Sequence, residues 1–421
     1  MSNRVPFLRL GVRRPGVVLL LASVAAISSP AQSLTVLHSF CAQNECSDGG
    51  NPQTELLEAR DGTFYGANFF DGANGAGTIF RITRIGTLST VYNFCSLPNC
   101  ADGRDSSGLV QGNDGDFYGT TATGGNTNFC SGDGCGSIYK VTTGGVLTTL
   151  YSFTGADGVA PEAALLQSTD GNFYGTTYGG GLHNSGTVFR LTPDRVLTTL
   201  YSFCSQNQCM DGWAPHSALV RGRDGNFYGT TLYGGANSQA PFSGTVFKIT
   251  PEGVHSVLYS FCSVGRCLDG GSPNGLVLGV DGNFYGTTSG GGTGSGCYLN
   301  GQYGCGTVFQ ITPAGVLTTL YSFTGSGPAA ALVQATDENF YGTIAGHLAL
   351  GYDGAIFKMT SHGVLSTLHT FSGSDGNDPE AALVQARDGN FYGTTFYGGD
   401  NNGGTVFRLS GAPGPNAVHS F

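Results

Sequence analysis

One eight-residue phrase, DGNFYGTT, recurs along this chain and sets the period of the whole sequence. It stands at 170–177, 224–231, 281–288 and 388–395, and near-copies occupy 61–68, 114–121 and 337–344. The seven Phe-Tyr-Gly triplets begin 51 to 57 residues apart. A fixed period near fifty residues indicates a repeat architecture, in which each unit buries its apolar surface against its neighbours.

One repeat, residues 161–203, divides into four short runs rich in β-branched and aromatic residues, each bounded by turn residues. We expect strands at 164–167, 172–177, 187–192 and 196–203. Asp and Gly suit the first turn, because Asp bonds its own backbone and Gly accepts a positive φ. In the third run, Phe189 and Leu191 share one side and Val188 lies on the other, so both faces of the sheet are apolar.

A four-stranded sheet with two apolar faces cannot bury both of them alone. Packing seven such sheets radially buries both faces and leaves only short edges, which is the β-propeller solution. The sequence therefore predicts an all-β, seven-bladed β-propeller over 32–421, built from seven repeats of about 54 residues with four antiparallel strands each. The repeated Phe and Tyr are interpreted as core between blades rather than as ligand-stacking residues. At 11% charged residues and 71 Gly, the composition could also fit disorder, but the strict period argues against it.

The phrases DGNFYGTT, GGxxxxGTVF and ITPxGxLTTLYSF resemble the GloVer tandem repeat of exported bacterial proteins, and the resemblance covers 34–421. It brings no assigned chemistry. The order of the runs is also similar to that of NHL and gluconolactonase-type propellers. That similarity implies that the LVQ run is the inner strand A, the FYG run strand B, the GTVF run strand C and the LTTLYSF run the outer strand D.

Ring closure follows from this register. A D-type run at 34–40 precedes the first strand A, whereas the last set of A, B and C strands, ending near Leu409, has no D strand behind it. We expect the amino-terminal strand to complete the last blade and close the ring. The segment Ala417–Phe421, AVHSF, is a shorter D-type candidate for the same edge, and we favour the longer amino-terminal strand.

The amino terminus is typical of a secretory signal peptide spanning residues 1–31. Four Arg precede a short apolar run, and small residues at 29–31 mark a cleavage site after Ala31. A membrane anchor is the alternative, but about 20 apolar residues are needed to span a bilayer. Without residues 1–31, which hold four Arg and no acidic residue, the formal net charge falls from −10 to −14. So acidic a chain is a poor partner for nucleic acid.

Twelve cysteines form six local pairs. Repeats with a long loop after LYSF contain both cysteines, and repeats with a short loop contain neither. In an exported chain this pattern predicts disulfides within loops rather than zinc ligands. The predicted pairs are Cys41/Cys46, Cys95/Cys100, Cys130/Cys135, Cys204/Cys209, Cys262/Cys267 and Cys297/Cys305.

The cysteine loops should gather on one face of the ring. Four pairs fall in D-to-A connections and two in B-to-C connections, and in an antiparallel blade both kinds of connection emerge on the same face. Loops held on a rigid scaffold commonly do the recognition. We therefore expect recognition on the face that carries the disulfides.

Candidate site residues lie in the same connections. An Asp of a repeated Asp-Gly pair is either a turn residue or a ligand in a ring of carboxylates around Ca²⁺. The position before strand A varies among repeats and either lines a ligand-binding mouth or faces solvent. Trp213, the only tryptophan, either stacks on a sugar or packs over the neighbouring disulfide. The Asp set is Asp48, Asp102, Asp157, Asp211, Asp269 and Asp375; the variable set offers Gln53, Glu162, His216, Asn274 and Glu380 as ligand-binding residues, with Ser106 and Ala329 as its other members.

Catalytic motifs such as HExxH, GxSxG or a phosphate-binding loop are absent from the sequence. Gluconolactonase-type propellers hold a divalent metal in the central channel, but here the corresponding slot often contains Gln (Gln111, Gln167, Gln334, Gln385) and no acidic set. We therefore expect no catalytic residues and no cofactor beyond Ca²⁺. The prediction is a monomeric extracellular binding module, secreted, periplasmic or on the cell surface, whose ligand is a glycan or a protein. The alternatives are a hydrolase, lyase or lactonase with its site in the channel, and a structural surface protein without a ligand.

Overall fold

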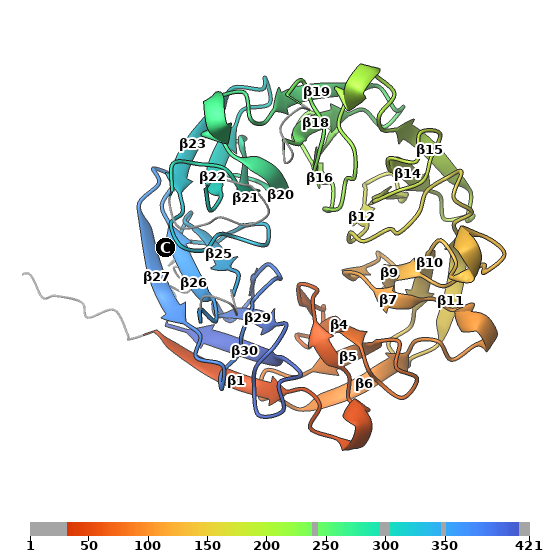
Figure 1. The fold of residues 1–421 in the computed structure, drawn as a ribbon. Coiled ribbons are helices and arrows are strands. Elements are labelled where there is room, and N and C mark those ends of the chain that lie inside the picture. The colour runs from red at the N-terminus through yellow and green to blue at the C-terminus, as the bar shows by residue number, and fades with distance from the viewer. Residues whose placement is uncertain (1–31, 238–242, 295–303, 347–350, 412–421) are drawn as a thin grey trace, which may run out of the picture. The chain divides into compact units, whose positions relative to one another are not determined.

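The computed structural model describes residues 32–237, 243–294, 304–346 and 351–411. The predicted signal peptide, Cys297 and the segment Ala417–Phe421 lie outside these ranges. The described residues form seven sheets of antiparallel strands arranged around a central axis, and in every blade except the fifth the innermost strand is the shortest (Figure 1). The prediction of a seven-bladed β-propeller with four strands per blade is confirmed.

Each blade runs from strand A at the axis to strand D at the rim. In that order the strands are, for blade 1, β3 (Leu57–Glu58), β4 (Phe64–Phe70), β5 (Thr78–Ile82) and β6 (Leu88–Asn93); for blade 2, β8 (Val110–Gln111), β9 (Phe117–Thr123), β10 (Ser137–Val141) and β11 (Leu147–Ser152); for blade 3, β12 (Leu166–Gln167), β13 (Phe173–Thr177), β14 (Thr187–Leu191) and β15 (Leu197–Ser202).

The remaining blades follow the same order. They are, for blade 4, β16 (Val220–Arg221), β17 (Phe227–Thr231), β18 (Thr245–Ile249) and β19 (His255–Ser260); for blade 5, β20 (Gly271–Leu278), β21 (Phe284–Gly290), β22 (Thr307–Ile311) and β23 (Leu317–Ser322); for blade 6, β24 (Val333–Gln334), β25 (Phe340–Ile344), β26 (Ala355–Met359) and β27 (Leu365–Thr370); for blade 7, β28 (Val384–Gln385), β29 (Phe391–Thr395), β30 (Thr405–Ser410) and β1 (Ser33–Ser39).

Strand β1 closes the ring, as the register predicts. It pairs antiparallel with β30, from Ser33 opposite Ser410 to Ser39 opposite Thr405. The first strand of the chain and its last strand C therefore belong to one sheet (Figure 1). Opening the ring would require breaking this sheet, so the closure couples the two ends of the described chain.

Strand A is shorter than expected. In blade 3 it spans Leu166–Gln167 instead of 164–167. The reason lies in the neighbouring blade: the carbonyl oxygen of Ala163 accepts a hydrogen bond from Thr120 Oγ1 of blade 2, at 3.1 Å. The backbone just before strand A therefore bonds across to the preceding blade instead of extending the pairing with its own strand B.

The D-to-A connections contain structure that the sequence analysis missed. Two short strands, β2 (Gly50–Pro52) and β7 (Arg104–Ser106), pair with strand B of their own blades. Five of the cysteine loops, those with both cysteines among the described residues, also contain a short 3₁₀ turn. These turns are η1 (Asn44–Cys46), η2 (Pro98–Cys100), η3 (Cys130–Gly132), η4 (Asn207–Cys209) and η5 (Gly265–Cys267).

The first half of the repeated phrase builds the tight turn between strands A and B. In blade 3, Asp170 Oδ1 accepts a hydrogen bond from the backbone N–H of Asn172 at 3.1 Å, and Gly171 has a φ of 83°. Asp170 Oδ2 accepts from the Tyr174 hydroxyl at 2.8 Å. Burial opposes ionisation of Asp170, but these hydrogen bonds outweigh it and hold the pKa of the carboxyl below its ordinary value. The Asp thus fixes the turn and the tyrosine together.

The second half of the phrase joins neighbouring blades. Phe173 and Tyr174 point to opposite faces of the sheet, and Tyr174 contacts Phe227 of blade 4 with ring centroids 4.2 Å apart. Equivalent Tyr–Phe contacts link every pair of adjacent blades, including blades 7 and 1. The next residue must be Gly, because a Cβ on Gly175 would lie 2.5 Å from Phe189 Cζ. The phrase is therefore repeated because each copy supplies one turn and one inter-blade contact.

The buried apolar residues divide into seven clusters, and each cluster is shared by two adjacent blades. In blade 3, Phe189 and Leu191 pack toward blade 2, whereas Val188 packs toward blade 4. This confirms that both faces of the sheet are apolar and that the repeated aromatic residues are core. No described helix is both long and apolar enough for a membrane span.

Candidate functional site

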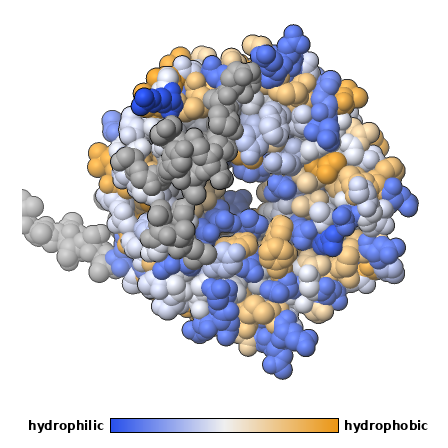
Figure 2. Space-filling model, in the orientation of Figure 1, coloured by the Kyte–Doolittle hydropathy of each residue, from blue (hydrophilic) through white to orange (hydrophobic). Residues whose placement is uncertain are grey.

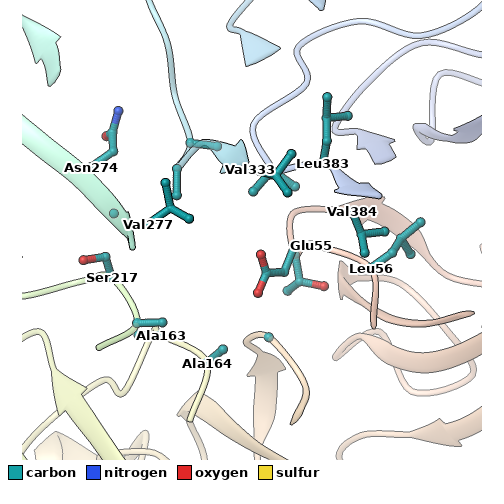
Figure 3. Close-up of a pocket in the computed structure, with 18 of the residues that line it drawn as sticks. Glu55, Leu56, Ala163, Ala164, Ser217, Asn274, Val277, Val333, Leu383 and Val384 are labelled. Carbon is teal, nitrogen blue, oxygen red and sulfur yellow. The ribbon is translucent and has the colours of Figure 1, made fainter. Parts of the chain in front are cut away.

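A channel on the axis of the ring holds a cavity with a volume of about 1240 Å³. It is lined by residues of five A strands, β3, β16, β20, β24 and β28, and by the residues that precede strand A in blades 1 to 4, 6 and 7 (Figure 3). Figure 2 shows an opening at the centre of the ring. The channel has a loop end, defined by the D-to-A and B-to-C connections, and a turn end, defined by the A-to-B and C-to-D turns.

The variable position before strand A faces this channel in all seven blades. The predicted residues Gln53, Glu162, His216, Asn274 and Glu380 all line the cavity, together with Ser106 and Ala329. Residues more than 50 positions apart in sequence therefore converge on one space at the loop end. Ligand binding by these residues stays a prediction.

Asn274 and Ser106 are held in place by hydrogen bonds. Asn274 Nδ2 donates to Thr287 Oγ1 at 3.0 Å and to the carbonyl oxygen of Pro328 at 3.2 Å, and Ser106 Oγ lies 2.7 Å from the Tyr139 hydroxyl. His216 differs. Its Nδ1 is buried and has no hydrogen-bond partner among the described residues, and burial lowers the pKa of its imidazole to about 4. His216 is therefore neutral at neutral pH.

Glu55 is a channel residue that the sequence analysis missed. Its carboxylate projects into the space between the A strands (Figure 3). It is enclosed by protein while its oxygens stay open to the water of the channel, and burial raises its pKa. The sequence carries a signal for it: Glu55 directly precedes a buried Leu, and the equivalent position in the other repeats holds only small residues. These are Gly108, Ala164, Ala218, Gly275, Ala331 and Ala382.

The small residues have a steric cause. A Cβ on Gly108 would lie 2.9 Å from Ala164 Cβ, and a Cβ on Gly275 would lie 3.0 Å from Ala331 Cβ. The seven chain segments are therefore crowded at this level of the channel. A single long acidic side chain fits there because its neighbours around the ring are Gly or Ala.

Two more carboxylates share the cavity with Glu55. Burial also raises the pKa of Glu162 and of Glu380. Gln53 Nε2 donates a hydrogen bond to Glu380 Oε2 at 3.0 Å, which partly offsets the effect of burial. Among the described lining residues there is no Lys and no Arg. The carboxylates at the loop end therefore have no countercharge from the protein.

The Gln residues at the end of strand A hold blades together. Gln111 Oε1 accepts a hydrogen bond from the backbone N–H of Arg60 in blade 1, and Gln385 Oε1 accepts from that of Thr336 in blade 6. Gln167 and Gln334 make the same contact with the preceding blade. These amides have a structural role at the turn end.

The six Asp residues considered as Ca²⁺ ligands are bonded within their own loops. Asp102 accepts hydrogen bonds from the Tyr92 hydroxyl at 2.7 Å and from the backbone N–H groups of Ser96 and Leu97. Asp157, Asp211 and Asp269 also accept a hydrogen bond from a Tyr hydroxyl. Asp48 and Asp375 are hydrogen-bonded instead to a His side chain, at the position where the other repeats have the Tyr. Contacts of this kind are those expected of a turn residue. Ca²⁺ binding by this set stays a prediction.

Five of the six predicted disulfides are present among the described residues. Cys305 is also disulfide-bonded, but its predicted partner Cys297 lies outside the described residues. The five pairs are Cys41–Cys46, Cys95–Cys100, Cys130–Cys135, Cys204–Cys209 and Cys262–Cys267.

Cys135 forms its predicted disulfide in the connection between β9 and β10, and its side chain is 0% exposed. It belongs to the apolar cluster between blades 2 and 3, together with Ile138 and Phe153. Cys135 lies two residues before β10, where a small apolar side chain gains by burial. The disulfide to Cys130 therefore ties the loop to the core.

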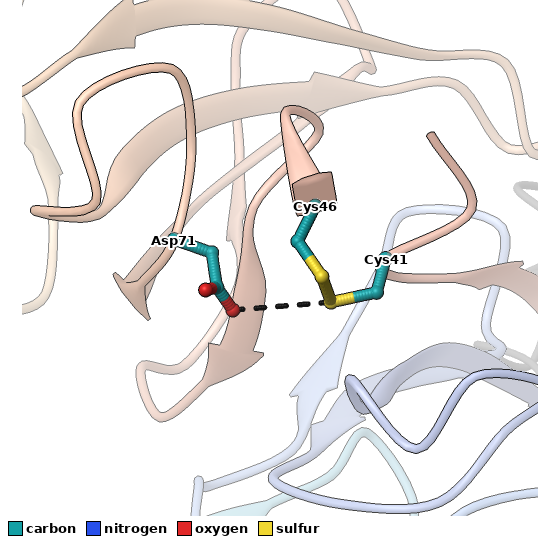
Figure 4. A group of neighbouring side chains, drawn as sticks. All are labelled: Cys41, Cys46 and Asp71. Carbon is teal, nitrogen blue, oxygen red and sulfur yellow. Dashed lines mark hydrogen bonds between the residues drawn. A yellow bond between two sulfur atoms is a disulfide. The ribbon is translucent and has the colours of Figure 1, made fainter. Parts of the chain in front are cut away.

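The first disulfide lies beside a carboxylate. Asp71 Oδ2 is 3.8 Å from Cys41 Sγ (Figure 4). Burial, followed by the charge of Asp48, raises the pKa of Asp71. Because the sulfurs of Cys41 and Cys46 are bonded to each other, this group is a poor metal site.

Trp213 lies on the loop end outside the cavity. It remains partly exposed, and its ring stacks on Tyr233 with centroids 4.3 Å apart. Its backbone N–H donates to the Tyr233 carbonyl oxygen at 3.0 Å. Tyr178 is close by: burial, then the charges of Tyr233 and Glu162, raise the pKa of its hydroxyl. An aromatic group therefore lies beside Glu162 at the loop end.

Charge is divided unequally between the two ends. Of the 28 acidic residues, all within the described ranges, 16 lie in D-to-A and B-to-C connections, whereas only two of the 14 Lys and Arg after residue 31 lie there. The other twelve acidic and twelve basic residues lie in strands and tight turns. The loop-end acidic residues are Glu45, Asp48, Glu55, Asp71, Asp102, Asp105, Asp133, Asp157, Glu162, Asp211, Asp269, Asp353, Asp375, Asp378, Glu380 and Asp400, and the two basic residues are Arg104 and Arg266.

Solved structures share the fold at low sequence identity. The extracellular domain of a proposed one-component system from B. thetaiotaomicron is 12% identical, with a TM-score of 0.55, and the match covers 90% of this chain but 42% of that one. A proposed 6-phosphogluconolactonase from Bacteroides fragilis is 14% identical, with a TM-score of 0.51, covering 84% of this chain and 98% of that one. This chain thus spans less than half of the first of these structures. At these identities the likeness shows the fold alone.

No curated protein matches the sequence. The model of the Gloeobacter/Verrucomicrobia repeat family matches residues 23–132, 98–299 and 269–421, which together cover nearly the whole chain. The repeats of this chain are thus of a known type. The chain belongs to the Gloeobacter/Verrucomicrobia repeat family.

Proposed function

We propose that this protein is an exported binding module that takes up its ligand at the loop end of the central channel. The observation that carries the proposal is a convergence: the residues at the variable position before strand A, one from each of seven similar repeats, all line one cavity. A rigid scaffold that varies only around one opening is the usual arrangement of a recognition site.

Export is supported by the disulfides and by the amino-terminal sequence. Disulfides persist in oxidising compartments outside the cytosol, and the chain has five in its described part. The basic and apolar segment before Ala31 is that of a signal peptide. The extracellular sensor domain that shares the fold is in line with this placement. We propose a secreted, periplasmic or surface-exposed monomer.

The test is a binding screen with a plugged channel. Ala164 lines the channel at its crowded level, so Ala164→Trp should fill the cavity. The matched control is Ala314→Trp, since Ala314 is exposed in a turn at the other end. A panel of neutral, anionic and cationic small molecules would be followed by thermal shift and calorimetry.

We expect at least one compound class to bind the parent protein, to bind Ala314→Trp equally and to lose binding to Ala164→Trp. Binding that survives in Ala164→Trp would place the site elsewhere and contradict the proposal. A panel in which nothing binds would also contradict it. Turnover of a lactone or a polysaccharide that Ala164→Trp abolishes would favour an enzyme instead.

A further inference from the structure

The charge of the loop-end cavity restricts what it can hold. Its ionisable lining residues at this end are Glu55, Glu162, Glu380 and the neutral His216. An anionic ligand would meet three carboxylates and no cation. A neutral ligand would displace water from the carboxylates of Glu55 and Glu162, which have no hydrogen-bond partner among the described residues, and such desolvation is costly. A cationic ligand supplies the missing countercharge.

Glu55 is the strongest indication. Its carboxylate makes no hydrogen bond and no ion pair within the described residues, although it is surrounded by the seven blades and directed into the cavity (Figure 3). Its six equivalents are Gly or Ala. Its oxygens are exposed to the water of the channel, whereas Glu58 is paired with Arg84. The Glu55 carboxylate is therefore accessible to a ligand in the channel.

The spacing of the carboxylates argues against a single metal ion. Among the described residues, the only group of three His, Cys, Asp or Glu side chains with ligand atoms close enough to hold one ion is Cys41, Cys46 and Asp71. Glu55, Glu162 and Glu380 do not form such a group, and Ca²⁺ needs six to eight oxygen ligands at about 2.4 Å. The cavity, at about 1240 Å³, has room for an extended molecule with separated charges.

We infer that the loop end of the channel binds an extended organic cation, a linear oligoamine, whose ammonium groups pair with Glu55, Glu162 and Glu380. Gln53 holds the Glu380 carboxylate in place through its 3.0 Å hydrogen bond. The neutral ring of His216 offers a hydrogen-bond acceptor to an ammonium group. Phe69 and the Ala residues just before the A strands form the apolar wall against which the methylene segments would pack. This inference rests on the proposed function and names its ligand class.

The charge of the connections around the cavity also favours a cationic ligand. The loop end carries 16 acidic and two basic residues, so its field concentrates cations near the opening and repels anions. Association of a cation should therefore slow and weaken as salt rises, because ions screen charges beyond about 10 Å at 0.1 M ionic strength.

The experiment measures binding of spermidine by calorimetry to the full-length mature protein. The neutral probe is octane-1,8-diol, which is similar in length and has hydroxyls in place of ammonium groups, and the anionic probe is citrate. The variants are Glu55→Gln, Glu162→Gln and Glu380→Gln, singly and together. Glu252→Gln is the matched control, because Glu252 is exposed at the turn end.

We expect spermidine to bind and the two other probes not to bind. Each Gln variant should weaken binding about tenfold, since a charge-assisted contact contributes about 1.4 kcal/mol or more. Glu252→Gln should leave binding unchanged, and the triple variant should abolish it. Folding of every variant would be checked by circular dichroism.

Two results would overturn the inference. One is spermidine binding that is equal in the parent and in the triple variant. The other is no spermidine binding at millimolar concentration. If, in the second case, another probe binds and Ala164→Trp blocks it, the ligand class is wrong while the proposed function stands. If no probe binds, both proposals fail.

Discussion

The two ends of the propeller are built from the same repeats but follow different rules. In the strands and tight turns, twelve acidic residues balance twelve basic ones, and the phrase DGNFYGTT, which forms the A-to-B turn, is nearly invariant. Its Asp and Tyr side chains, with the Gln of strand A, bond turns and neighbouring blades to one another. At the loop end, 16 acidic residues face two basic ones, and the loops differ in length, disulfide content and channel residue.

This difference indicates that stability and the proposed recognition depend on different parts of the ring. The inter-blade contacts that close the ring involve residues common to all repeats, so the loops above them can vary with little effect on closure. The variable channel residues carry unpaired charge that does not stabilise the fold. The following predictions probe this contrast, beginning with the largest effect.

Removing strand β1 should disrupt the ring most strongly. Deletion of residues 32–40 leaves the edge of β30 unpaired and removes Phe40 from the cluster between blades 7 and 1. We expect loss of cooperative thermal unfolding and aggregation, measured by calorimetry and size-exclusion chromatography. Deletion of residues 412–421 is the control and should leave the melting temperature unchanged, since β1 already occupies that edge. The reverse pattern would refute closure by the amino-terminal strand.

Truncating a repeated tyrosine should cost a large part of one interface. Tyr174 is 1% exposed and contacts Phe227 of the next blade. Tyr174→Ala should lower the free energy of unfolding by about 4 kcal/mol. Tyr174→Phe keeps the ring and loses only the bond to Asp170, so it should cost about 1 kcal/mol. Urea denaturation measures both, and equal costs would show that the hydroxyl, not the ring contact, holds the blades.

Removing a loop disulfide should have a smaller and local effect. Cys204→Ser with Cys209→Ser opens a ring of a few residues at the loop end, which the loop-entropy estimate values at about 2 kcal/mol. The far-ultraviolet circular dichroism should stay unchanged, and amide exchange should rise only in residues near 204–213. Complete unfolding on reduction of the protein would contradict the separation between the two ends.

The smallest effect concerns pH. Burial raises the folded-state pKa of Glu55 above its ordinary value of 4.5, so the folded protein binds this proton more tightly than the unfolded chain does. Its contribution to stability is then favourable at low pH and is lost as pH rises from the unfolded to the folded pKa. Glu55→Gln should therefore slightly raise the melting temperature relative to the parent at about pH 7, and the gain should vanish at about pH 3.

Glu252→Gln serves as the comparison, because Glu252 is exposed at the turn end. This variant should have the same melting temperature as the parent at both pH values. A Glu55→Gln variant that is less stable than the parent at about pH 7 would mean that the carboxylate has a structural partner in the folded state.

Much of the fold could be predicted because each repeat contains the local sequence signals for its own turns and strands. The Asp-Gly turn, the alternation of Phe189 and Leu191 with Val188, and the leading D-type run fix the turns, the two apolar faces and the closure. The length of strand A could not be predicted, because its limit comes from a hydrogen bond to the preceding blade. The burial of Cys135 was missed for a similar reason, since the residues that cover it come partly from blade 3.

The candidate site could be predicted only in part from the sequence. The variable residues Glu162 and Glu380 stood out because neighbouring repeats differ at that position, and the structure brings them into one cavity. Glu55 was missed because comparison of the repeats concentrated on the position just before strand A. Its importance appears once the channel shows that the equivalent Gly and Ala residues face the same space.

By itself, the sequence determined the number of blades, the residues of each interface and the way the ring closes, since these depend on local periodicity and on burial of two apolar faces. Only the tertiary structure decided which charges are neighbours. Electrostatic interactions depend on distance in space, and ring closure brings Glu55, Glu162 and Glu380 from three separate repeats to a single axis.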